Sequence, residues 1–297
     1  MMKRVTLFLF TNIAVLLVLS FAVRLLGVDR FLGVSGIQLL PLLVFASIMG
    51  FAGSFISLAM SKWMAKSAYN IQVIQSPAND MEHWLLNTVQ QLSKLANIPM
   101  PEVGVYESPE ANAFATGPTK KNSIVAVSTG LLQQMSRQQV EGVLAHEVSH
   151  VANGDMVTMT LLQGIVNTFV IFLSRVVGYF IDRVVFKNEE RVGMGYYLGI
   201  MISQVVFGIL ASIIVLSFSR RREFAADADA ARLWGKGAMI DALEQLVRIT
   251  SRGAVLDDRS KALASFKINH RQGRGITAWF ASHPPLQDRI DALRQST

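Results

Sequence analysis

The pentapeptide His146-Glu147-Val148-Ser149-His150 is the most informative stretch of this chain. On an α-helix, residues four positions apart share a face, so His146 and His150 can present both imidazoles to one metal ion. Glu147 lies about a hundred degrees around the helix from His146, where its carboxylate can accept a proton from a metal-bound water. The pattern predicts a zinc hydrolase; two histidines satisfied by hydrogen bonds on a polar helix are the alternative.

The flanking residues predict a helix over residues 137–152. Ser136 is a good N-cap, and Gln139 three positions later completes a capping-box pattern. Apolar residues then recur at helical spacing, namely Val140, Val143, Leu144 and Val151. Asn153-Gly154 is a typical helix stop. Both histidines therefore belong to one capped helix.

A catalytic zinc site requires a third protein ligand, with the fourth position left to water. Met156 stands where a longer metal motif would place another His, and its side chain cannot serve. Glu223 is the favoured candidate, because Glu223 and Asp227 lie one helical turn apart in a segment of small residues. Asp227 can then accept the free N–H of a ligand His and set its tautomer. Asp155 is the fallback ligand, and an exposed acidic pair that balances the preceding arginines is the alternative.

Apolar residues make up 51% of the chain and charged residues 16%, and the apolar residues are concentrated in blocks. Four membrane spans are predicted, at about residues 5–23, 37–61, 156–174 and 192–219. The first block lacks a convincing cleavage site, so we interpret it as an uncleaved anchor. For the last two blocks, a buried soluble core or a hairpin on the bilayer surface is the alternative.

Positive residues flank the first two blocks, with Lys3 and Arg4 before them and Lys62 and Lys66 after them. The positive-inside rule places both ends of this hairpin in the cytoplasm. Because the two histidines and Glu223 must meet at one ion, the chain between them crosses the membrane either twice or not at all, and we expect two crossings.

The polar stretch before the metal helix predicts a small sheet. An amphipathic helix is expected over residues 84–96, and strands over 103–106, 113–116 and 124–128. The edge of such a sheet can bind an extended peptide as an added strand. We expect this edge at Asn112-Ala113-Phe114-Ala115, with an ordinary structural strand as the alternative.

These residues resemble the HtpX family of bacterial membrane zinc metalloproteases. The resemblance covers nearly the whole chain and rests on four blocks in the family's order: NAFA at 112–115, HEVSHVANGDM at 146–156, EFAAD at 223–227 and SHPP at 282–285. It implies one Zn²⁺ per chain bound by His146, His150 and Glu223. It also implies Glu147 as the catalytic base and a substrate backbone paired near residues 112–115.

In related membrane zinc proteases, the His of the last block and an Arg six residues later support the oxyanion that forms on the attacked carbonyl. Here these residues would be His283 and Arg289. Pro284 and Pro285 suit a helix start, with Arg289 on a different face from the apolar stripe that follows. A capping His and a salt-bridged Arg are the alternative.

The expected fold class is a mainly α membrane protein, with four transmembrane helices and a cytoplasmic zincin-like α+β metalloprotease domain that contains a small sheet. The expected parts are a transmembrane hairpin at 1–62, the first part of the protease domain at 63–155, a second transmembrane pair at 156–219 and the second part of the domain at 220–297. The resemblance places the protein in the bacterial inner membrane and implies quality control of misfolded or damaged membrane proteins.

The expected partners are unfolded or membrane-protein substrates and the lipid bilayer. Nucleic acid is not expected, since the net charge of +7 comes largely from cations that flank the spans. Three other functions are alternatives. The first is an intramembrane protease, which the polar residues around the motif disfavour. The others are a protease for a specific, lipidated substrate and a non-catalytic scaffold with a structural zinc, which would have no use for Glu147.

Overall fold

The computed structural model describes residues 38–188, 192–251 and 283–296. The chain divides into two compact units. The helical unit comprises Met1–Ile56 and Thr160–Val215, and the sheet unit comprises Ser57–Met159 and Leu216–Thr297. The first expected membrane span, at residues 5–23, lies outside the described residues.

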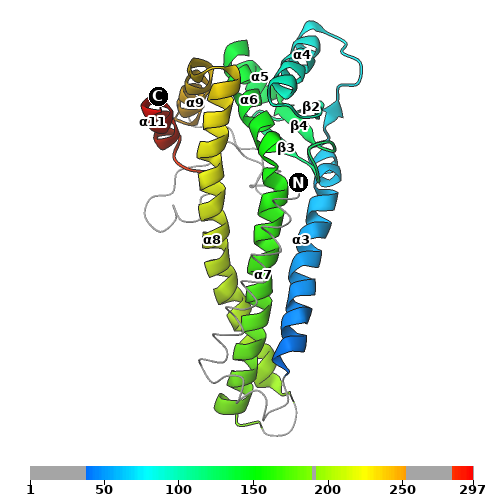
Figure 1. Ribbon diagram of the computed structural model, residues 1–297, viewed down its shortest axis with the longest axis vertical. Coiled ribbons are helices and arrows are strands. Elements are labelled where there is room, and N and C mark those ends of the chain that lie inside the picture. The colour runs from blue at the N-terminus through cyan, green and yellow to red at the C-terminus, as the bar shows by residue number, and fades with distance from the viewer. Residues whose placement is uncertain (1–37, 189–191, 252–282, 297) are drawn as a thin grey trace. The chain divides into compact units, whose positions relative to one another are not determined.

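Three helices among the described residues are long and apolar enough to cross a membrane. They are α3 (Leu39–Tyr69), α7 (Asp155–Phe180) with a π-helical continuation (Ile181–Val185), and α8 (Met194–Trp234). Figure 1 shows each of them as a long continuous helix. They overlap the spans expected at 37–61, 156–174 and 192–219, and each extends further toward its C-terminus.

Helix α7 continues past the charged residue that was expected to end its span. Arg175 lies inside the helix, where its guanidinium carbon is 4.9 Å from the centre of the Phe45 ring and its Nη1 donates to the carbonyl of Ile171 at 3.2 Å. These contacts satisfy the cation within the unit, so the chain need not leave the helix there. The charged stretch 175–191, expected as a connecting loop, is helical as far as Val185.

In the helical unit, α3 and α7 pack through both apolar and polar side chains. Leu43 and Ala46 of α3 bury against Phe172 of α7, and the Asn167 amide donates to the Ser54 hydroxyl at 3.4 Å. Interhelical hydrogen bonds of this kind stabilise helix pairs in lipid. Many large apolar side chains of α8 stay exposed, including Met201, Ile202, Val205, Val206 and Ile209. Such a surface is suited to contact with lipid.

The sheet unit contains a four-stranded sheet in the order β1-β2-β4-β3. Its strands are β1 (Gln72–Val73), β2 (Glu102–Tyr106), β3 (Ala113–Thr116) and β4 (Ile124–Ser128). The central pair, β2 and β4, is parallel, and the outer pairs are antiparallel. The three expected strands are present, and β3 forms an edge as expected. Strand β1 was missed because two residues are too few to show an alternating pattern.

Two helices, α4 (Asp80–Leu95) and α6 (Arg137–Asn153), lie against one face of this sheet, and α5 (Thr129–Gln134) leads from β4 toward α6. Helix α9 (Lys236–Ser251) packs on α6 and α11 (Leu286–Gln295) packs on α9, so that these helices and the sheet share one core. Helix α4 begins before the expected residue 84, because the Asn79 side chain caps it by accepting from the Glu82 N–H. On the other face, Ala65 and Tyr69 near the end of α3 pack against Phe114 of β3 and its neighbours.

Candidate metal centre

Helix α6 presents the two motif histidines on one buried face. The expected capping box is present at Ser136 and Gln139, and Gly154 ends the helix in the left-handed conformation at φ 64°. Between these caps, the Nε2 atoms of His146 and His150 lie 3.1 Å apart, with their rings nearly perpendicular at 87°. The helix and its caps thus direct the Nε2 atoms of both imidazoles toward the same position.

Glu223 reaches that point from helix α8. Its Oε2 lies 3.4 Å from His146 Nε2, and its Oε1 lies 3.3 Å from His150 Nε2. Among the described residues, His146, His150 and Glu223 form a group whose ligand atoms all lie within 4.8 Å of one another. The Glu223 side chain is only 3% exposed, so water does not screen its charge from the imidazoles.

The spacing of these atoms suits a tetrahedral zinc ion. Ligand atoms bound at about 2.0–2.1 Å in tetrahedral geometry lie about 3.3 Å apart. The two Nε2 atoms lie 3.1 Å apart, close to that value, and each Nε2 has one Glu223 oxygen at a similar distance, Oε2 at 3.4 Å from His146 and Oε1 at 3.3 Å from His150. The donor set of two imidazoles and one carboxylate is also one that catalytic zinc sites use. The residues present therefore fit the ion.

A carboxylate lies behind each histidine ring. The Nδ1 of His146 is 2.9 Å from Oδ1 of Asp227, and the Nδ1 of His150 is 2.6 Å from Oδ2 of Asp155. A carboxylate accepts the Nδ1–H of a neutral imidazole, which leaves the lone pair of Nε2 free for a metal. Asp155, the fallback ligand in the sequence analysis, therefore lies on the side of the ring away from the ligand cluster.

Arg289 lies behind Asp227 and is fully buried. Its Nε donates to Oδ2 of Asp227 at 2.7 Å and its Nη2 donates to Oδ1 at 2.6 Å. Its Nη1 is 3.6 Å from Oε2 of Glu223. The apolar stripe of α11 suggested that Arg289 faces elsewhere, but the structure buries it beside Ile290 and Leu293 because Asp227 supplies the partner charge.

The electrostatics of the site favour protons or a cation at the histidines. Burial lowers the pKa of His150, but Glu223 and Asp155 outweigh it and raise that pKa to about 10. At His146, burial also lowers the pKa, but hydrogen bonds to Asp227 and Glu223 outweigh it, so the pKa of His146 is raised. For Glu147, burial raises the carboxyl pKa, while the histidines, His146 first, lower it. A raised pKa suits Glu147 to accept a proton near neutral pH.

The residues of this site lie in a region that matches a known protein family. The sequence model of peptidase family M48 matches residues 79–297. The chain belongs to peptidase family M48. Protease HtpX homolog from Methylacidiphilum infernorum (isolate V4) is 59% identical over 298 residues, which cover 99% of each chain. Protease HtpX from Thioalkalivibrio sulfidiphilus (strain HL-EbGR7) is 55% identical over 295 residues, also 99% of each. The resemblance to the HtpX family is confirmed.

The fold of this M48 chain also resembles a solved structure, the crystal structure of S. mikatae Ste24p. The two share 19% sequence identity at a TM-score of 0.61, over 97% of this chain and 67% of that chain. M48 membership and the three apolar helices establish a membrane-anchored peptidase that acts on polypeptides. The M48 family also implies a metal, for which His146, His150 and Glu223 are the fitting residues.

The remaining expected residues of this M48 site lie close to the ligand cluster or to α6. The Nδ1 of His283 is 2.7 Å from Oε2 of Glu223. Strand β3 contacts α6 and is the outermost strand of the sheet on that side. Asn112 is held just before it by two hydrogen bonds with Ser128: the Ser128 N–H donates to the Asn112 carbonyl at 2.9 Å, and the Asn112 N–H donates to the Ser128 hydroxyl at 3.0 Å. The Arg289 contacts are those of the salt-bridged alternative.

Sequence reasoning missed two partners in this M48 site. Asp155 was considered only as a ligand, and Arg222, whose Nη1 lies 3.6 Å from Oδ2 of Asp155, was considered only as a flanking cation. The one available signal was the position of Asp155 directly after the helix stop at Gly154, where a reversal of the chain can bring it back to the preceding helix.

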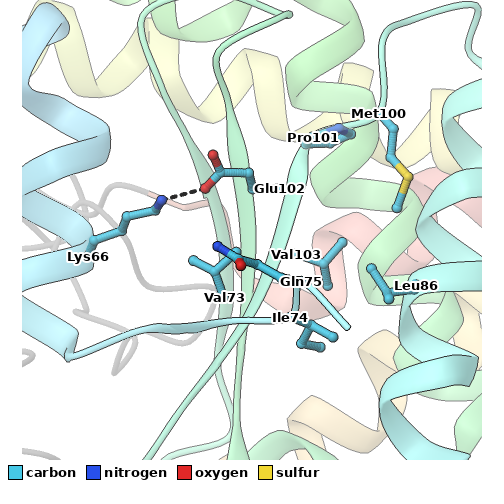
Figure 2. A pocket seen from close by; sticks show the side chains of 9 residues that line it. All are labelled: Lys66, Val73, Ile74, Gln75, Leu86, Met100, Pro101, Glu102 and Val103. Carbon is cyan, nitrogen blue, oxygen red and sulfur yellow. Dashed lines mark ion pairs between the residues drawn. The ribbon is translucent and has the colours of Figure 1, made fainter. Parts of the chain in front are cut away.

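Figure 2 shows a separate pocket beside β1 and β2, at the edge of the sheet opposite β3. Its volume is about 340 Å³. An ion pair between Lys66 and Glu102 lies at one side, and Ile74, Leu86 and Met100 line it with apolar surface. None of its lining residues belongs to the candidate metal centre, so this pocket takes no part in the M48 site.

Proposed function

We propose that this chain is a zinc endopeptidase in which His146, His150 and Glu223 bind one Zn²⁺ and Glu147 is the general base. The observation that carries the proposal is the convergence of the two Nε2 atoms, 3.1 Å apart, on the buried Glu223 carboxylate, which has an oxygen within 3.4 Å of each. When bound, zinc supplies a Lewis acid for the peptide carbonyl and lowers the pKa of a bound water to about 7.

Within this proposal, the protein side chains move the proton and hold the reacting groups. Glu147 accepts the proton of the attacking water and passes it to the leaving amine. His283, beside Glu223 and 14% exposed at its side chain, donates a hydrogen bond to the oxyanion. Asp227 sets the tautomer of His146, and Arg289 supports the oxyanion indirectly by neutralising Asp227 and Glu223.

The substrate lies along the outer strand β3 in this proposal. The backbone of Asn112, Ala113, Phe114 and Ala115 would pair with an extended peptide as an added strand. Because β3 contacts α6, a peptide bound there runs past the helix that carries the motif. Unfolded polypeptides and the unstructured tails of membrane proteins can adopt that extended form.

We further propose four transmembrane helices in the bacterial inner membrane, with the catalytic residues facing the cytoplasm. Three apolar helices, the net charge of +7 and the named HtpX relatives support this arrangement. The hairpin would be 1–62, the second pair 156–219, and the protease domain 63–155 with 220–297. A protease so anchored serves quality control, since misfolded or damaged membrane proteins present their tails at the same surface.

The test uses purified, detergent-solubilised full-length protein and casein as an unfolded substrate. The wild type should cleave with zinc and stop with a chelator. Glu147→Gln should keep its zinc and lose cleavage, whereas Glu244→Gln, a control on α9 outside the metal centre, should match the wild type. Cleavage by Glu147→Gln at the wild-type rate would falsify the assignment of the base.

The same assay separates the alternatives. A wild type that binds zinc tightly but cleaves no peptide, with or without a lipid group attached, would be a zinc-stabilised scaffold. Cleavage of a prenylated peptide without cleavage of its unmodified counterpart would instead indicate a protease specific for lipidated substrates.

A further inference from the structure

Each candidate histidine ligand has the same arrangement of charges behind it. His146 contacts Asp227, and Asp227 contacts Arg289. His150 contacts Asp155, and Oδ2 of Asp155 lies 3.6 Å from Nη1 of Arg222. The second set has no role in the proposed reaction so far, although its His–carboxylate contact of 2.6 Å is the shorter of the two.

The contact between His150 and Asp155 forms because α7 begins directly after α6 ends. Helix α6 ends at Gly154, whose left-handed conformation at φ 64° turns the chain, and α7 begins at the next residue. This turn brings the carboxylate of Asp155 back against His150, in the preceding helix. A residue with a β-carbon would disfavour that conformation, so Gly154 is what makes the contact accessible.

The position of Asp155 determines which nitrogen of His150 is free. The carboxylate accepts the proton of Nδ1 and leaves Nε2 facing His146 Nε2 and Glu223 Oε1. Without the carboxylate, either ring nitrogen could carry the proton, and the ring could rotate about its bonds. Second partners of this kind typically change metal affinity by about 10- to 100-fold.

Arg222 connects this contact to the helix that carries the third ligand. It precedes Glu223 on α8, and its Nη2 donates to the Ser219 hydroxyl at 3.3 Å, which directs the side chain along its own helix. The side chain is 18% exposed, so its attraction to Asp155 is only partly screened. The ion pair therefore joins the first residue of α7 to α8 directly beside the ligand cluster.

We propose that Asp155 and Arg222 are positioning residues for the metal centre: Asp155 fixes the tautomer and rotation of His150, and Arg222 holds Asp155 while tying α7 to α8. This inference rests on the proposed zinc site. In this proposal, the ion pair between α7 and α8 directly influences the spacing between His150 and Glu223.

The experiment measures zinc affinity of the full-length protein in detergent by competition with a chelator, and the visible absorption of the Co²⁺-substituted protein. Asp155→Asn should bind zinc about 10- to 100-fold more weakly and shift the cobalt bands. Arg222→Gln should weaken binding less, and Arg222→Lys should stay near the wild type, because a single cation at 3.6 Å is all that the contact uses. Arg232→Gln breaks an exposed ion pair on the same helix and should change nothing.

A double variant tests whether Arg222 acts through Asp155. If it does, Arg222→Gln should have no further effect on zinc affinity in the Asp155→Asn background. Additive losses would overturn the coupling of the two residues. This comparison, made on protein that retains its helical circular dichroism, also separates positioning from a general loss of folding, since Arg222→Gln leaves Asp155 in place.

The two proposals fail in different ways. A wild type that binds zinc and cleaves casein, together with an Asp155→Asn variant of unchanged zinc affinity and cobalt spectrum, overturns the positioning role alone. A wild type that binds no zinc overturns the proposed function, and the positioning role with it.

Discussion

The Arg289 side chain is charged and fully buried, at 0% exposure. Replacing it with an uncharged residue tests how the candidate site is stabilised. Two hydrogen bonds of 2.7 and 2.6 Å join it to Asp227, whose own exposure is 1%. Arg289→Met keeps an apolar stem of similar length but leaves a buried carboxylate without its cation. Removing one partner of a buried ion pair destabilises a protein by about 3–5 kcal/mol, or roughly a hundred- to several-thousand-fold in the folding equilibrium.

The assay is thermal and denaturant unfolding of the detergent-solubilised protein, followed by circular dichroism. Arg294→Gln is the matched control, since Arg294 lies on the same helix and pairs with Glu244 at 2.6 Å but is 54% exposed. That exposed pair contributes no more than about 1 kcal/mol. Adding Asp227→Asn to Arg289→Met should restore much of the stability. Equal losses in the buried and exposed variants would refute this reasoning.

Two further predictions concern protons and packing. Burial lowers the pKa of His150, but Glu223 and Asp155 raise it to about 10, so the metal-free ring is protonated at pH 7 and zinc must displace that proton. Zinc affinity should therefore fall as pH falls, and calorimetry in two buffers of different ionisation enthalpy should detect release of about one proton or more; no release would contradict the charge state. A β-carbon added at Gly142 would lie 2.6 Å from the Ala238 carbonyl oxygen, so Gly142→Leu should destabilise the protein by about 1–3 kcal/mol. Gly237→Ala, whose β-carbon meets nothing within 4 Å, is its control, and equal unfolding midpoints would show that α6 and α9 are not closely packed there.

The parts of the site that follow from local rules could be predicted from the sequence. Ser136, Gln139 and Gly154 determine where α6 begins and ends, because caps act through neighbouring residues only. The three main strands followed from short segments rich in β-forming residues between turn residues. Both histidines then had to share a face, whatever the rest of the fold.

The parts that depend on distant partners could not be predicted. Arg289 was expected on a different face from the apolar stripe of its helix, yet Asp227, far away in sequence, makes its burial favourable. Arg175 was expected to end a span, but the Phe45 ring accommodates its cation inside the helix. Asp155 contacts His150 only because of the turn at Gly154. In each case the deciding contact crosses between elements, and residue spacing alone does not contain it.

X-ray absorption at the zinc edge of the purified, zinc-loaded protein tests the proposed metal centre most directly. The account predicts one zinc per chain with two imidazole nitrogens and a carboxylate oxygen at about 2.0–2.2 Å, and loss of tight binding in Glu223→Ala. An unchanged zinc spectrum and affinity in Glu223→Ala, or a bound zinc without two imidazole ligands, would contradict it.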